Sequence, residues 1–207
     1  MKEQNYQDMT DEEIDMLREA GNIASGNAMT SLSEFIQAPL DMSVVRVRIE
    51  KIHELSEVLG SAEEVIAGML IDIYGDINAM LLLALETESA IRIVNGMLNK
   101  NLRSLNEFDK MACSVLCETG NILAGSYSSA LNTFTGLNLD VSSPQIAIDM
   151  AGAILSYPAI KFLRNDSEML FIQTDFQEVN GILNGTYILI LDHTAYSSII
   201  KSMGAYI

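Results

Sequence analysis

An internal duplication is the feature of this chain that most constrains its fold. Residues 17–45 align with residues 116–144 at an offset of 99, and eleven of the aligned positions are identical. In the first copy these are Leu17, Glu19, Gly21, Asn22, Ile23, Gly26, Leu32, Phe35, Leu40, Asp41 and Ser43. A hydrophobic core accounts only for the apolar identities. The repeated Glu, Gly and Asn therefore point to a function that both copies share.

The predicted secondary structure repeats in the same order. In the first half, about 10–100, we expect a helix at 10–35, a strand at 40–49, strands at 64–74 and 77–85, and a helix at 86–98. In the second half, about 104–207, we expect a helix at 104–134, a strand at 139–148, a helix at 151–163, strands at 169–178 and 182–191, and a helix at 195–203. The two predicted hairpins favour antiparallel pairing.

Halves of about 100 residues are small for two independent hydrophobic cores. We therefore expect one α+β domain over 1–207, in which the halves share an antiparallel sheet about a pseudo-twofold axis. Two long motif helices and several shorter helices accompany this sheet. Each long helix opens on a capping box, Thr10-Asp-Glu-Glu13 in the first half and Ser104-Leu-Asn-Glu107 in the second.

The polar residues of the duplication share one face of each long helix. In the first copy, Asp15, Glu19, Asn22 and Gly26 are spaced by four, three and four residues. The second copy repeats this spacing with Ser114, Glu118, Asn121 and Gly125. Because the apolar positions lie largely on another face, we expect these polar side chains to point outward.

The repeated Gly-Asn pairs weaken the helices that contain them. A glycine inside a helix costs about 1 kcal/mol relative to alanine, and asparagine is a mediocre helix former. Gly21 and Gly120 can be explained by close packing, with the asparagines merely tolerated. The recurrence of the pair with Glu at the same offset favours a functional explanation.

The residue types limit the chemistry that this face can perform. An amide is neither a nucleophile nor a useful base, and no Ser/His/Asp or Cys/His set stands in for it. A carboxamide can donate and accept hydrogen bonds, and so can hold a water for attack. A neighbouring exposed Glu suits an ion pair with a basic residue of a partner. The reaction would then be completed across an interface.

The charge of the chain excludes several classes of partner. The net charge is −16, from 12 basic and 28 acidic residues, and there is no Lys/Arg cluster. Binding to nucleic acid or to an anionic membrane surface is therefore not expected. The longest apolar run, 79–85, is too short to span a membrane, and the N-terminus lacks the apolar segment of a signal peptide.

The two cysteines, Cys113 and Cys117, are interpreted as small core residues without an assigned role. His53 and His193 are distant from them in sequence, so we expect no metal site. Reduced cysteines and the missing signal sequence together predict a cytoplasmic protein.

At these motifs the chain resembles the CheC family of chemotaxis phosphatases, within the wider CheC/CheX/FliY group. The group's pattern is Asp or Ser, three residues, Glu, two residues, Asn, then twenty-two residues and Pro. The second copy follows it throughout with Ser114, Glu118, Asn121 and Pro144. The first copy has Asp15, Glu19 and Asn22, but Val45 stands where the pattern has proline.

The resemblance implies hydrolysis of the aspartyl phosphate on phosphorylated CheY. It implies that Asn22 and Asn121 orient the attacking water, and that Glu19 and Glu118 pair with the regulator's active-site lysine. Asp15, Ser114 and Pro144 would be supporting motif positions. The Mg²⁺ belongs to the regulator, so the phosphatase is expected to need no cofactor of its own.

The resemblance also implies binding to the receptor deamidase CheD. We expect a monomer, because the duplication supplies the twofold partner that a one-motif homologue finds in another chain. The alternative is a non-catalytic docking or adaptor module that binds CheY or CheD. A flagellar-switch component is a third interpretation, but such a chain would continue into a further domain after Ile207.

Overall fold

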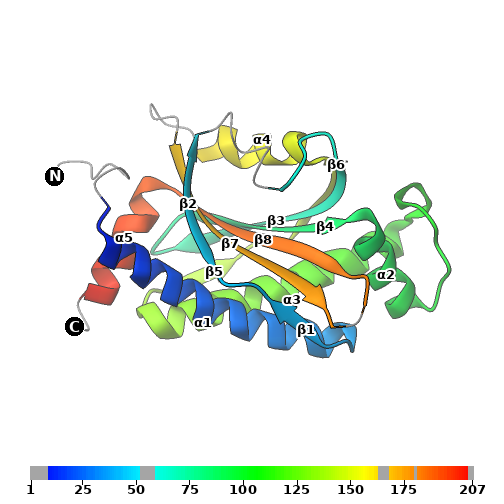
Figure 1. Cartoon of the computed structure of the whole chain (residues 1–207), viewed down its shortest axis with the longest axis horizontal. Helices are drawn as coiled ribbons and strands as arrows, with labels where there is room; N and C mark the ends of the chain where they lie inside the picture. Colours follow the sequence, from blue (N-terminus) through cyan, green and yellow to red (C-terminus); the bar gives the residue numbers. More distant parts are fainter. Residues whose placement is uncertain (1–8, 52–58, 163–167, 180, 205–207) are drawn as a thin grey trace.

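The structure, a computed structural model, describes residues 9–51, 59–162, 168–179 and 181–204. Within these residues, eight strands form one antiparallel sheet, and helices lie on both of its faces (Figure 1). The predicted α+β class and the antiparallel sheet are confirmed. None of the helices described combines the length and the apolar character needed to cross a bilayer.

Most elements lie close to their predicted positions. The first half contains α1 (Asp11–Ile36), β1 (Leu40–Met42), β2 (Arg46–Lys51), β3 (Val65–Gly75), β4 (Ala79–Glu86) and α2 (Thr87–Leu98). The second half contains η3 (Leu105–Glu107), α3 (Lys110–Thr135), β5 (Leu139–Val141), β6 (Gln145–Met150), α4 (Ala151–Phe162), β7 (Glu168–Glu178), β8 (Asn184–Leu191) and α5 (His193–Gly204). Residue 163, the predicted end of α4, lies outside the described residues.

The two halves exchange their edge strands. β4 and β8 pair at the centre of the sheet, with β3 beside β4 and β7 beside β8. β1 and β2 of the first half pair with β7, whereas β5 and β6 of the second half pair with β3. Swapping the halves leaves this pairing pattern unchanged, which is the pseudo-twofold relation that the duplication predicts.

The sheet separates two hydrophobic cores. α1 and α3 pack on one face, and α4 packs on the other (Figure 1). Side chains of a strand alternate between the faces, so Leu81 and Leu83 of β4 enter the core under α1 and α3. Met80 and Leu82 enter the core under α4. The motif helices therefore pack on a sheet whose central strands are buried on both faces.

The capping-box prediction holds for one long helix and is wrong for the other. At α1, Thr10 Oγ1 accepts from the Glu13 backbone N–H at 3.2 Å, and Glu13 Oε2 accepts from the Thr10 N–H at 2.9 Å. At Ser104 no capping box forms: the Ser104 hydroxyl donates to Glu107 Oε1 at 3.3 Å, and only the short η3 turn follows. Phe108 then adopts an extended conformation, and the chain restarts as α3 behind Asp109, whose carboxylate accepts from the Ala112 N–H at 2.9 Å.

The single strands predicted at 40–49 and 139–148 are each split in two by a serine. Ser43 exchanges two hydrogen bonds with the backbone of Asp175 on β7, one through its own N–H at 2.8 Å and one through its hydroxyl at 3.2 Å. Ser142 makes the same pair of bonds with Asp72 on β3, at 2.9 and 3.0 Å. The hydroxyl takes the place of a strand partner, and this explains why the serine is repeated.

The first glycine of each motif allows the helix to lie directly on the sheet. A Cβ atom at Gly21 would lie 2.8 Å from both Val45 Cγ1 and Ile172 Cγ2. A Cβ at Gly120 would lie 3.1 Å from Met69 Cβ. At Gly26, by contrast, a Cβ would meet no atom within 4 Å. Close packing therefore accounts for Gly21 and Gly120, and it leaves the adjoining asparagines unexplained.

This contrast predicts opposite effects of two alanine substitutions in the same helix. Gly21→Ala should lower the free energy of unfolding by about 1–3 kcal/mol, because the new methyl group overpacks the contact with β2 and β7. Gly26→Ala should raise it by up to about 1 kcal/mol through helix propensity alone. Urea unfolding of the two variants measures both effects. Equal midpoints for the two would contradict the packing role of Gly21.

Candidate functional site

The motif side chains lie near the middle of the two long helices and face outward, as predicted. Glu19, Glu118 and Asn121 are exposed, and Asn22 is half-buried. The 26-residue helices α1 and α3 hold these side chains on a continuous, capped backbone that is packed against the sheet. Each Glu/Asn pair is therefore presented to solvent from a rigid support.

The two pairs form separate sites. α1 and α3 run antiparallel: Ser126 Oγ donates to Ser31 Oγ at 2.7 Å, and Ile23 and Phe134 line the same groove between the helices. Asn22 precedes Ser31 by nine residues along α1, and Asn121 precedes Ser126 by five residues along α3. Because the helices are antiparallel, these two offsets from the serine contact point in opposite directions and add up. At 1.5 Å per residue the two asparagines are about 20 Å apart along the helix axes. They cannot act on one reacting group together.

In the first site, charged and buried side chains surround the Glu/Asn pair. Asp15 forms an ion pair with Arg18 on the same helix, where both groups are well exposed to solvent. Val45 is only 1% exposed and packs where α1 meets the sheet beside Gly21. Val45, which stands at the position of the motif proline, therefore packs between α1 and the sheet. It does so at Gly21, the residue before Asn22.

The second site has the same plan with uncharged supports. The Ser114 hydroxyl donates to the Lys110 carbonyl at 2.8 Å, so it is held against its own helix. Cys117 occupies the position of Arg18, and its thiol lies 3.9 Å from the Pro144 carbonyl oxygen. Pro144 thus borders α3 as Val45 borders α1. The structure brings all the predicted motif residues of each copy to one place.

Two cysteines lie beside the second site, and the pKa of one of them, Cys117, is raised. Cys113 and Cys117 are both reduced and half-buried. Burial, and secondarily the proximity of Cys113, raises the pKa of Cys117, because the thiolate would lose its hydration. Over the residues that the structure describes, no three His, Cys, Asp or Glu side chains gather as metal ligands. His53 lies outside the described residues.

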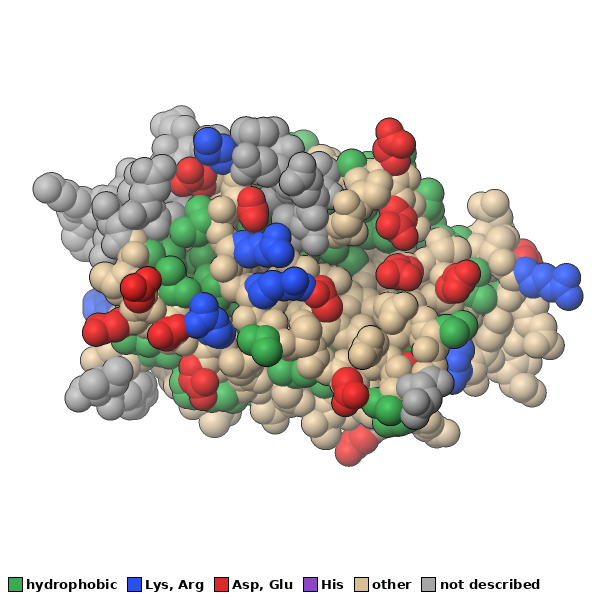
Figure 2. Space-filling view, viewed as in Figure 1, with side chains coloured by type: hydrophobic (Ala, Val, Ile, Leu, Met, Phe, Trp, Pro, Cys, Tyr) green, Lys and Arg blue, Asp and Glu red, His purple; other side chains and the backbone are tan. Residues whose placement is uncertain are grey.

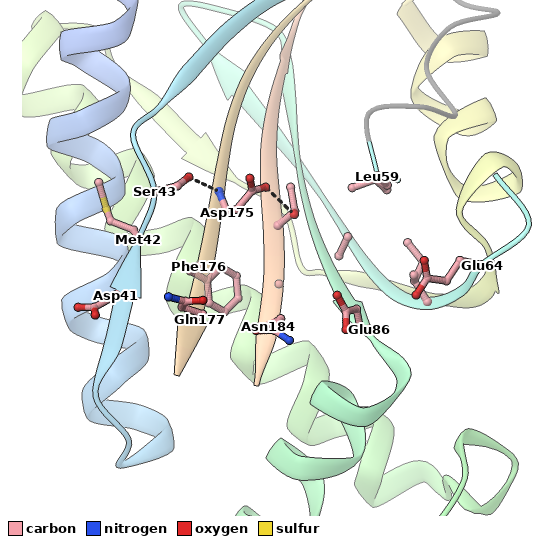
Figure 3. A pocket seen from close by; sticks show the side chains of 14 residues that line it. Asp41, Met42, Ser43, Leu59, Glu64, Glu86, Asp175, Phe176, Gln177 and Asn184 are labelled. Atoms are coloured by element: carbon pink, nitrogen blue, oxygen red, sulfur yellow. Dashed lines mark hydrogen bonds between the residues drawn. The ribbon is translucent and has the colours of Figure 1, made fainter. Parts of the chain in front are cut away.

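A pocket of about 400 Å³ lies on the face of the sheet that α4 partly covers (Figure 3). Asp175 at its wall accepts hydrogen bonds from Thr186 Oγ1 at 2.8 Å and Gln173 Nε2 at 3.0 Å, and pairs with Arg46. Asp41, Glu64 and Glu86 add acidic groups to the lining. This pocket is not predictable from local sequence patterns, because its wall joins β1, β3, β4, β7 and β8.

Charged side chains of the two signs are distributed differently over the surface. On the face shown in Figure 2, Asp and Glu side chains are widely spread, and Lys and Arg side chains gather mainly over β2. Two of the β2 arginines are engaged with acids, Arg46 with Asp175 and Arg48 with Glu50 at 3.7 Å. This small group is not the extended basic footprint that a nucleic-acid backbone requires.

Comparisons with known proteins agree with the motif positions. The model of the CheC-like family matches residues 12–44 and 111–148, which hold both motif copies. The chain is 27% identical over 205 residues to the CheY-P phosphatase CheC of Bacillus subtilis strain 168, covering 97% of this chain and 98% of that protein. It is 27% identical over 106 residues to the CheY-P phosphatase CheX of Thermotoga maritima, covering 48% and 66%.

The fold is also found among solved structures. The crystal structure of Thermotoga maritima FliY matches with a TM-score of 0.73 at 20% identity, over 96% of this chain and 98% of that one. At this level of identity the likeness shows the fold alone.

The raised pKa of Cys117 predicts slow alkylation at neutral pH. In a Cys113→Ser variant, Cys117 is the remaining cysteine of the chain. Its reaction with iodoacetamide, followed against pH, should have a midpoint above that of N-acetylcysteine, because burial stabilises the neutral thiol. A midpoint at or below that of the small thiol would contradict this account, and full unfolding in urea should abolish the difference.

Proposed function

Because the CheC-like family model matches both motif copies, we propose that this chain is a phosphatase that hydrolyses the aspartyl phosphate of a phosphorylated CheY response regulator. The observation that carries this proposal is the pair of exposed Glu/Asn motifs on two rigid helices. Two relatives named as CheY-P phosphatases support it, and one of them matches nearly the whole chain.

Asn22 and Asn121 are proposed to orient the attacking water. The carboxamide accepts a hydrogen bond from the water and leaves the oxygen lone pair directed at phosphorus. Attack forms a new P–O bond, the bond to the aspartate oxygen breaks, and the products are inorganic phosphate and the free carboxylate. The gain comes from positioning, which can be large when the reacting atoms are held in line. A mid-helix amide on a packed support suits this role.

Glu19 and Glu118 are proposed to anchor the regulator through an ion pair with its active-site lysine. Both carboxylates are exposed and lie one helical turn before the asparagine, so a lysine and a water could be engaged from one face. The Mg²⁺ is proposed to be supplied by the regulator. Asp15, Ser114 and Pro144 support the local backbone in this scheme and do not touch the phosphoryl group.

Both copies are expected to be active. Val45 takes over the place of the motif proline by packing against α1, and Asn22 keeps its position on the helix. We further propose that the protein works as a cytoplasmic monomer and that CheD is a second partner. A docking module that binds CheY or CheD without turnover is the alternative, and the experiment below separates the two.

Replacing the asparagines tests the water-positioning role. Decay of ³²P-labelled CheY should be accelerated by the wild-type chain, and acceleration should survive Asn22→Ala or Asn121→Ala alone. The double variant should lose at least about 100-fold of the stimulated rate, since both positioned amides are gone. Asn27→Ala, on the same helix, removes a side chain that donates to the Ile23 carbonyl at 2.9 Å, and it is the matched control. Binding without faster decay by the wild-type chain would establish the docking module instead.

Replacing the glutamates tests the anchoring role. The Glu19→Ala/Glu118→Ala variant should raise KM for phosphorylated CheY about tenfold and leave kcat nearly unchanged, because a charge-assisted contact is lost in ground and transition states alike. Glu34→Ala, an exposed acid near the end of α1, should behave as wild type. A fall in kcat at constant KM would show that the glutamates act in the chemical step.

A further inference from the structure

Each motif site has one strongly exposed apolar side chain that the other copy lacks. Val44, at the break between β1 and β2, is 73% exposed, and Met111, in the first turn of α3, is 59% exposed. At an offset of 99 their counterparts are Ser143 and Glu12, both exposed and polar. Because the other copy folds with a polar residue at each of these positions, the fold does not require either apolar side chain.

Val44 lies at the rim of the first site. It precedes Val45, whose side chain packs against α1 at Gly21, immediately before Asn22. The chain cannot swing away here, because Ser43 is bound to the backbone of Asp175 through two hydrogen bonds. An apolar side chain is thus held in solvent beside the proposed reaction centre.

Met111 lies on α3 about 10 Å before Glu118, on the N-terminal side of the second site. It precedes Ser114 by three residues and Glu118 by seven, a spacing that places all three side chains on one face of α3. The cap at Asp109 fixes the first turn, and Met111 is exposed along the same face as the motif. Methionine adapts to uneven partner surfaces because its side chain is unbranched and polarisable.

We infer that Val44 and Met111 are docking residues for the response regulator, one for each site, so that the two copies hold the same partner by different contacts. This inference rests on the proposed function. Single exposed apolar residues are common on protein surfaces. Here their place carries the argument: Val44 adjoins the packing contact beside Asn22, Met111 shares the motif face of α3, and the counterpart of each is polar in the other copy. The partner surface that meets Val44 or Met111 is then apolar.

The test exchanges each residue for a polar one in chains with a single working asparagine. In the Asn121→Ala background, which leaves the first site, Val44→Ser should raise KM about fivefold and Met111→Gln should have no effect. In the Asn22→Ala background the two results should be reversed. Values of kcat should stay constant, since these side chains bind and do not react. Ile160→Ser, on α4 across the sheet and also 73% exposed, is the control.

Two outcomes would overturn the inference. Either KM is unchanged by both substitutions, or each substitution changes KM equally in both backgrounds. Failure of the proposed function looks different, because hydrolysis would then be absent or independent of the asparagines. Binding to CheY held in its activated form by beryllofluoride decides the docking role in that case. Loss of one of two binding sites on each substitution supports it, and unchanged binding overturns it.

Discussion

The exchange of edge strands between the halves is the constraint on which the rest of the structure depends. β1 and β2 pair with β7, and β5 and β6 pair with β3, so neither half has a complete sheet of its own. Each motif helix consequently packs on a part of the sheet that includes strands of the other half. Gly21 of α1 meets Ile172 of β7, and Gly120 of α3 meets Met69 of β3. The position of each asparagine is fixed by contacts that cross between the halves.

Periodicity and repetition in the sequence predict the helices, the two hairpins and the outward face of the motifs. These features depend on neighbours within a few residues, so a single sequence contains the information. The start of α3 is different: the box at Ser104 is a sound local signal, but the extended Phe108 packs into the core and ends that turn. The breaks at Ser43 and Ser142 depend on partner strands more than 60 residues away.

Prediction of the candidate site from the sequence is limited in the same way, because long-range contacts are missing from local patterns. The spacing of Glu19, Asn22 and their repeats predicts which side chains share a face, but not that the two sites are about 20 Å apart along the helix axes. That separation follows from the antiparallel contact of α1 with α3. Likewise, the sequence marks Val45 as a departure from a motif. Only the packing against Gly21 shows that a buried valine can take over the place of a proline.

When two copies of a motif are joined in one polypeptide, the two copies can change independently, which is impossible in a symmetric dimer. In a dimer of identical chains every substitution appears twice, so both surfaces change together. Here Arg18 and Cys117 occupy equivalent positions, as do Val45 and Pro144, and each can vary alone. Two sites that saturate at different partner concentrations give a more graded response than two identical ones. Because the two copies are covalently linked, substitutions can change the surroundings of one motif and leave those of the other unchanged.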